Sequence, residues 1–315
     1  MTLNRFEQLF YEALKDAMEP RGCTLSRTMI HKNNEDLTGI VLCRDYTNVG
    51  ITIYPKQLYK EWKQGVTMDE LILSIREDIL FKKIPALDIQ NFDREQAETK
   101  LMACVVGYEK NQEWLQKFPH QRIEDMALYA RWYVADDASF AVSHEIMGQL
   151  KMTKEELLEM ARENQRKTAN FYPIENFFLG FDDIDVYQKE FNGTFDRSMI
   201  GAANPMYLLG SSRGLQGAVV ALDPVVLKAV HDCLESDFYI LPSSIHETII
   251  IPTSEWDKGT DVLEDMVRTI NAEEVPIQDQ LTDSVYYSDG HRLRRVGNEQ
   301  KMTVEISIEG HRHKR

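Results

Sequence analysis

The sequence predicts an α+β protein of two lobes, with largely antiparallel sheets and packed helices. Short strand-like segments come in pairs separated by turn residues, and amphipathic helical segments lie between the pairs. The regular alternation of strand and helix that would indicate a parallel sheet does not occur along the chain. The length of 315 residues fits about two domains, and a content of 43% hydrophobic and 28% charged residues is typical of a globular protein.

The first predicted domain is an N-terminal α+β unit over residues 1–84. Apolar residues at helical spacing predict a helix that begins near Leu3 and ends at Pro20. Three strands and a helix are expected next, at 23–30, 37–43, 50–54 and 56–63. Thr67 and Glu70 have the spacing of a capping box, which predicts that another helix begins there.

The second predicted domain covers residues 85–290 and contains a repeated pattern of a hairpin followed by a helix. A short helix within 85–100, a strand at 101–106 and a helix at 110–117 are expected before the repeat. The first copy has strands at 126–134 and 139–142 and a helix from Ser143. The second copy has strands at 206–209 and 218–222 and a helix at 225–234. Asp223 and Pro224 are typical of the N-cap and the first helical position of that last helix.

Further elements surround these two copies. A second capping box at Thr153 and Glu156 predicts a helix at 157–167. A hairpin with strands at 238–241 and 248–251, a helix at 261–271 and a strand at 285–287 are expected to complete the domain. The last predicted region, 291–315, has a strand at 302–307 and a basic tail at 311–315.

The charge is strongly negative and unevenly distributed. The chain has 36 Lys and Arg against 51 Asp and Glu, a net charge of -15. Residues 291–315 contain seven Lys or Arg and three Glu, a balance of +4, so the other 290 residues carry -19. Phosphates repel such a body, which argues against general nucleic-acid binding and favours a protein partner with basic surface.

The expected location is the cytoplasm, with no membrane association. The four cysteines, Cys23, Cys43, Cys104 and Cys233, form no CxxC pair and are expected to be free thiols in a reducing compartment. The N-terminal residues lack the basic and apolar regions of a signal peptide. No apolar run reaches the roughly 18 residues of a membrane-spanning helix.

Several runs along the chain together resemble an uncharacterised bacterial family. They are KNN at 32–34 with LTGI at 37–40, DFYILPSSIHE at 237–247 and DSVYY at 283–287. The chain is similar, from residue 4 to residue 290, to a domain of unknown function found in gut anaerobes. The resemblance implies a single cytosolic family, often multicopy and sometimes near mobile elements. It implies no catalytic residue.

The loop 242–247 is the best candidate for a binding site. Ser243, Ser244, His246 and Glu247 could provide a nucleophile and its base. However, neighbouring residues of a strand point to opposite faces, and the small residues of a GxSxG elbow are missing. A structural interpretation has the serine hydroxyls capping loop amides and His246 bonded to a backbone carbonyl.

Metal and cofactor sites are not expected. The pairs His144–Glu145 and His246–Glu247 could supply ligands if they met, but the chain has no HExxH motif and no Cys–His cluster. The glycine-bearing segment 210–217 lacks the GK[ST] ending of a phosphate-binding loop. No residue is therefore assigned to a metal, a cofactor or a catalytic role.

Two functions from different classes follow. The first is a non-catalytic binding or interaction protein, with a mobile-element or defence-linked regulator as one version of it. Its partner is expected to be another protein, and no pattern indicates an oligomeric state. The alternative is a hydrolase or a metal-dependent enzyme that uses the loop 242–247.

Overall fold

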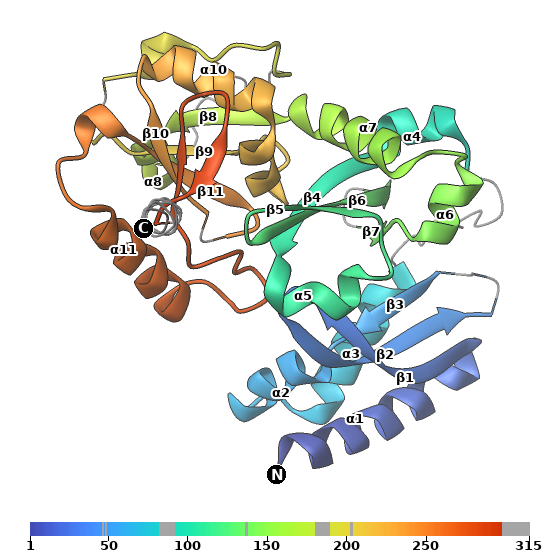
Figure 1. The fold of residues 1–315 in the computed structure, drawn as a ribbon. Coiled ribbons are helices and arrows are strands. Elements are labelled where there is room, and N and C mark those ends of the chain that lie inside the picture. Colours follow the sequence, from blue (N-terminus) through green and yellow to red (C-terminus); the bar gives the residue numbers. More distant parts are fainter. Residues whose placement is uncertain are drawn as a thin grey trace, which may run out of the picture. The chain divides into compact units, whose positions relative to one another are not determined.

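The structure, a computed structural model, divides the chain into two compact units. It describes residues 1–45, 47, 49–81, 92–135, 138–179, 190–201, 204–242 and 244–297. Unit 1 is Met1–Phe92 with Val134–Ala138, and unit 2 is Asp93–Tyr133 with Ser139–Arg315. Both units combine antiparallel sheets with packed helices (Figure 1), so the predicted α+β class is confirmed.

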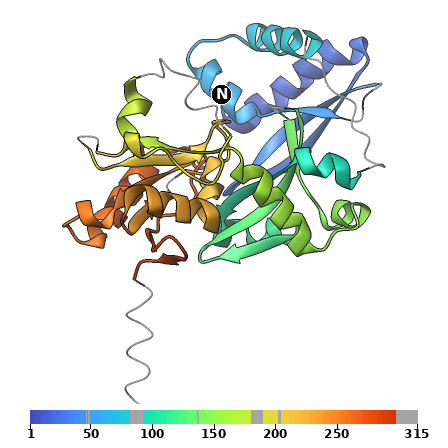
Figure 2. The same ribbon diagram turned by 90° about the horizontal axis from the view of Figure 1, so that it is seen from above.

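Unit 1 is a three-stranded antiparallel sheet with helices packed against it. Its elements are α1 (Leu3–Met18), η1 (Glu19–Arg21), β1 (Cys23–Lys32), β2 (Glu35–Arg44), β3 (Gly50–Ile53), α2 (Pro55–Lys63) and α3 (Met68–Phe81), in the strand order β1-β2-β3. Phe6, Phe10 and Leu14 recur at helical spacing along α1 and are buried in one core with residues of the sheet. Helix α1 lies alongside this sheet in Figure 2. The capping box at Thr67 and Glu70 is confirmed, because each residue bonds the other's backbone N–H.

Unit 2 begins with a four-stranded antiparallel sheet. Its elements are α4 (Arg94–Lys100), β4 (Leu101–Gly107), α5 (Tyr108–Leu115), β5 (His120–Ile123), β6 (Met126–Ala135), β7 (Ala138–Ala141), α6 (His144–Gln149) and α7 (Lys154–Arg166). Strand β6 pairs with β4 along one edge and with β5 and β7 along the other. The predicted caps of α6 and α7, Ser143 and Thr153, each accept a backbone N–H of the first turn. Strand β5 was not predicted, because four partly exposed residues carry little periodicity.

The second sheet of unit 2 has six strands in the order β13-β12-β10-β11-β9-β8, all antiparallel. Its strands are β8 (Ala169–Pro173), β9 (Tyr207–Ser211), β10 (Phe238–Leu241), β11 (Glu247–Pro252), β12 (Tyr286–Ser288) and β13 (Leu293–Arg295). The helical elements around it are α8 (Ile174–Leu179), η2 (Arg197–Met199), η3 (Gly217–Leu222), α10 (Pro224–Leu234), η4 (Thr253–Glu255) and α11 (Thr260–Glu273). The predicted hairpin of β10 and β11 is confirmed, and Asp223 and Pro224 begin α10 as expected.

The predicted strand at 218–222 is wrong, because this segment lies in the 3₁₀ helix η3. Both edges of β9 are already occupied, by β8 and by β11, so no free edge remains for the expected hairpin partner. All six residues of η3 are buried, and a short run buried on every side shows no period that separates strand from helix. The second copy is therefore not a hairpin, and the predicted hairpin–helix repeat does not hold.

Two other predictions fall beyond the described residues. The strand expected at 302–307 and the basic tail at 311–315 both lie there. Within the described part of the chain, no helix is both long enough and apolar enough to span a membrane.

Candidate functional site

The loop between β10 and β11 is held from both sides by other segments of unit 2. Of the four predicted site residues, Ser243 lies outside the described part of the chain. Ser244 is buried, pairs with Gln280 as an isolated β-bridge, and its hydroxyl accepts the backbone N–H of His246 at 2.9 Å. The expected capping of a loop amide by a serine is thus present at Ser244.

His246 contacts two residues that sequence reasoning missed. Its Nδ1 accepts the backbone N–H of Gln216 at 3.3 Å, and its Nε2 lies 3.3 Å from Oδ1 of Asp279. The expected bond to a backbone carbonyl is therefore wrong. Gln216 has a left-handed backbone with φ 55°, and this turn directs an N–H, rather than a carbonyl, at the ring. An acceptor role for Nδ1 places the ring proton on Nε2, facing the carboxylate.

Glu247 is the first residue of β11 and pairs with Gly210 of β9. Burial raises the pKa of its carboxyl group, while the electrostatic effect of His246 and a hydrogen bond with Ser244 lower it in part. His246 precedes the strand, so the strand argument that placed it opposite Glu247 does not apply. The structure thus brings Ser244, His246 and Glu247 together, with Asp279 beside them.

The contacts in this loop favour a structural or binding role over catalysis. A serine nucleophile needs a base bonded to its hydroxyl, and both ring nitrogens of His246 are directed at other groups, Gln216 and Asp279. Within the described ranges, no group of three or more His, Cys, Asp or Glu side chains could hold a metal ion. His144, the other histidine considered, is the first residue of α6.

Replacing Glu247 by glutamine is expected to raise stability at neutral and basic pH. The raised pKa means that the folded protein holds this proton more tightly than the unfolded chain does. Ionisation of Glu247 therefore lowers the stability of the folded protein. The stability is greatest below the ordinary pKa of 4.5, where Glu247 is protonated in both states, and it falls as the pH rises through the pKa of the folded protein. Urea unfolding of wild type and Glu247→Gln between pH 4 and pH 8 measures the difference.

The two proteins should unfold at similar urea concentrations at pH 4 and diverge as the pH rises, with the variant more stable. Glu163→Gln, at an exposed position of α7, is the matched control and should follow the wild-type profile. A constant offset between Glu247→Gln and wild type at every pH would contradict the burial of an ionisable carboxyl group at this position.

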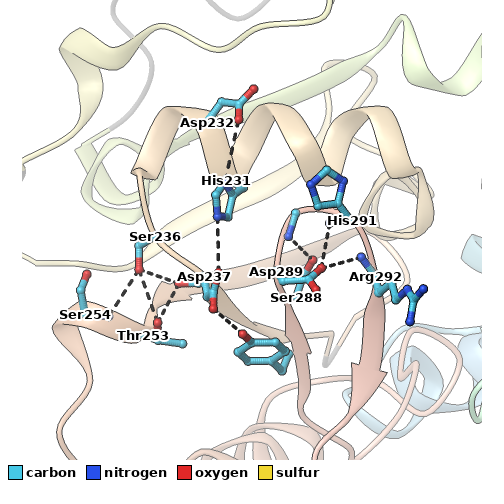
Figure 3. A network of polar contacts seen from close by, with 12 residues as sticks. His231, Asp232, Ser236, Asp237, Thr253, Ser254, Ser288, Asp289, His291 and Arg292 are labelled. Atoms are coloured by element: carbon cyan, nitrogen blue, oxygen red, sulfur yellow. Dashed lines mark hydrogen bonds and ion pairs between the residues drawn. The ribbon is translucent and has the colours of Figure 1, made fainter.

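A second polar cluster surrounds Asp237, the first residue of the DFYILPSSIHE run (Figure 3). One carboxylate oxygen lies 3.4 Å from Nε2 of His231 on α10, and the other accepts the hydroxyl of Tyr287 on β12. This hydrogen bond, together with burial, raises the pKa of Tyr287 to about 12. The backbone carbonyl of Asp237 accepts hydrogen bonds from Ser236 and Thr253 at 2.7 and 3.1 Å. Asp237 thus joins α10, η4 and β12, which is a positioning role.

A third cluster surrounds Asp125, in the turn between β5 and β6. Its carboxylate accepts the hydroxyls of Thr282 at 2.9 Å, Ser284 at 2.7 Å and Tyr286, and Arg295 lies 3.6 Å away. Asp237 and Asp125 therefore both bind the segment that contains the DSVYY run. The hydrogen bond between Asp237 and Tyr287 therefore connects two of the runs that carry the family resemblance, 237–247 and 283–287.

Comparison with known proteins adds a family but no activity. A model described as "Family of unknown function (DUF5688)" matches residues 3–289. The expected similarity to a domain of unknown function over nearly the whole chain is thereby confirmed. No curated protein and no solved structure matches the chain.

Proposed function

The chain belongs to DUF5688, a family of unknown function, and on that premise we propose that it is a non-catalytic protein-binding protein of the bacterial cytoplasm. The proposed partner presents basic and apolar side chains. The proposed docking surface consists of Leu215, Ile277 and the acidic segment 273–283, on the two segments of unit 2 that meet at His246.

Two exposed apolar side chains carry this proposal. Leu215 is 52% exposed and Ile277 is 45% exposed, the highest values among large apolar side chains in the described part of unit 2. Leu215 precedes Gln216, which bonds His246, and Ile277 lies two residues before Asp279, which contacts the same ring. Large apolar side chains that gather on an otherwise polar surface are typical of protein-binding sites.

The charge beside these two residues selects a basic partner. Segment 273–283 contains four carboxylates and no lysine or arginine. Glu273 and Glu274 are exposed, and the Asp279 side chain is 38% exposed. Opposite charges across an interface accelerate association and reject partners of the same sign.

Two further observations support the class and the compartment. The loop that could carry hydrolase chemistry has its histidine engaged by Gln216 and Asp279, which supports binding over catalysis. Cys23, Cys104 and Cys233 are buried free thiols, the form that cysteine commonly takes in a reducing cytoplasm.

Removing the two apolar side chains is expected to weaken the binding of a basic, apolar peptide by roughly tenfold or more, since each buried side chain contributes roughly 1.5 kcal/mol or more. The probe is a labelled peptide of alternating leucine and lysine, with a leucine–glutamate peptide for comparison. Fluorescence anisotropy would measure the binding of both peptides to wild type and to the double variant Leu215→Ser, Ile277→Ser.

The matched control is Leu73→Ser, which removes a 42% exposed leucine from α3 of unit 1. It should bind the lysine peptide as wild type does, and binding should weaken as salt screens the charges. Equal loss in the control and in the double variant would show that the peptide binds without this surface. Preference for the glutamate peptide would contradict the basic partner.

A further inference from the structure

Among the described residues, Arg131 of unit 2 has only neutral partners. Arg131 lies on β6, where Tyr129 and Tyr133 share its face of the sheet because alternate residues of a strand point the same way. Its Nε donates to the Ser139 hydroxyl at 3.0 Å, and its Nη2 donates to the Ser139 carbonyl at 2.9 Å. A further hydrogen bond joins the guanidinium group to Tyr129.

The described groups around Arg131 do not balance its charge. Burial raises the pKa of the Cys104 thiol and of the Tyr133 hydroxyl to about 12, and raises that of Tyr129 as well. All three groups are therefore neutral at physiological pH. Among the residues that the structure describes, no carboxylate forms an ion pair with Arg131.

Another arginine of the same unit shows the usual arrangement. Nε of Arg166 lies 2.8 Å from Oδ2 of Asp223, whose side chain is 2% exposed. The chain has 15 more acidic than basic residues, so carboxylates are plentiful. Removing a cation from water without a counter-ion is costly. A guanidinium group whose described partners are all neutral, in a chain so rich in carboxylates, fits a site whose negative charge comes from a ligand.

A second cation, Arg213, shares neighbours with Arg131. The guanidinium group of Arg213, in the turn after β9, lies 4.6 Å from the centre of the Tyr133 ring. Both arginines act electrostatically on Cys104 and on Tyr133. Arg131, Tyr133 and Ser139 are only partly buried and Arg213 is exposed, so solvent reaches this group of side chains.

We propose that Arg131 and Arg213, which both act on Tyr133, form a binding site for the oxyanion group of a small ligand, a carboxylate or a phosphate. The planar guanidinium group has five N–H donors, and Ser139 and Tyr129 take part of them. The donors that remain suit the paired oxygens of a carboxylate or phosphate group. This site is additional to the proposed protein-binding surface.

Isothermal titration of the full-length protein with inorganic phosphate and with citrate tests the site and separates the two ligand classes. Wild type is expected to bind at least one of them, and Arg131→Gln to bind it roughly tenfold or more weakly, because the variant loses the charge-assisted hydrogen bonds to the ligand oxygens. The matched control is Arg122→Gln. Arg122 also stacks on a tyrosine, Tyr108, at 4.1 Å, but it is paired with Glu109.

A second variant, Arg213→Gln, tests the site independently, because Arg131→Gln also loses the hydrogen bonds to Ser139 and could unfold for that reason. Arg213 is exposed, so its replacement should leave the fold intact and still weaken binding, whereas Arg122→Gln should bind as wild type does. Phosphate binding without citrate binding would assign a phosphorylated ligand, and the reverse a carboxylate. The proposal would be overturned if the titration showed no heat of binding with either ion at concentrations up to about 10 millimolar, which corresponds to a very weak dissociation constant. A folded Arg131→Gln or Arg213→Gln with wild-type affinity would overturn it as well.

Discussion

Replacing Gly217 by alanine is expected to destabilise unit 2 by about 3 kcal/mol, because the added Cβ has no room. An ideal Cβ at this position would lie 2.4 Å from the backbone oxygen of His246 and 2.4 Å from the backbone nitrogen of Ser211. Both neighbours are backbone atoms of packed segments, so neither can rotate away as a flexible side chain could. Urea unfolding, followed by far-ultraviolet circular dichroism, would measure the change.

The same substitution should also disturb the candidate loop. The N–H of Ala218 donates to the carbonyl of Ile245 at 3.2 Å, so η3 and the loop are bonded on both sides of Gly217. The matched control is Gly148→Ala in α6, where the added Cβ meets no heavy atom within 4 Å beyond its chain neighbours and the backbone of its own helix. Alanine there is expected to leave stability unchanged or to raise it by up to about 1 kcal/mol. Wild-type stability of Gly217→Ala would contradict the close packing of η3 against the loop.

Replacing Asp125 by alanine is expected to destabilise the protein by roughly 3–5 kcal/mol. The change leaves the hydroxyls of Ser284 and Tyr286, which are 4% and 0% exposed, without their acceptor. It also removes the acceptor of Thr282 and the ion pair with Arg295. Asp265→Ala, which removes a 75% exposed carboxylate from α11, is the matched control and should change stability by less than about 0.5 kcal/mol.

The contribution of Asp125 should also depend on pH. Burial acts to raise the pKa of its carboxyl group, but the hydrogen bonds from Ser284, Tyr286 and Thr282 and the charge of Arg295 outweigh it, and the net pKa is lowered. The stabilisation is therefore fully present above the ordinary pKa of 3.8 and is lost as the pH falls through the folded value. The gap between wild type and Asp125→Ala should narrow at acid pH. A gap that is constant down to pH 2 would contradict an ionised Asp125.

Local signals in the sequence predicted much of the secondary structure correctly. The capping boxes at Thr67 and Thr153 and the cap at Asp223 involve atoms within three residues of each other, so the sequence contains all of their partners. Periodicity located the helices of unit 1 and the hairpin of β10 and β11 for a similar reason. The signal failed at 218–222, because a fully buried run has the same pattern in a strand and in a helix.

The sequence by itself determined the α+β class, the helix starts and a polar loop with Ser244, His246 and Glu247. Only the tertiary structure decided what those side chains contact. Asp279 is 33 residues from His246 along the chain, and Asp125 binds hydroxyls 157 to 161 residues away. Cys104 and Arg213 likewise come near the Arg131 group only because packing brings β4 and the turn after β9 to β6. A local pattern fixes backbone conformation over a few residues, whereas the partners of a buried polar group depend on which distant segments the hydrophobic core brings beside it.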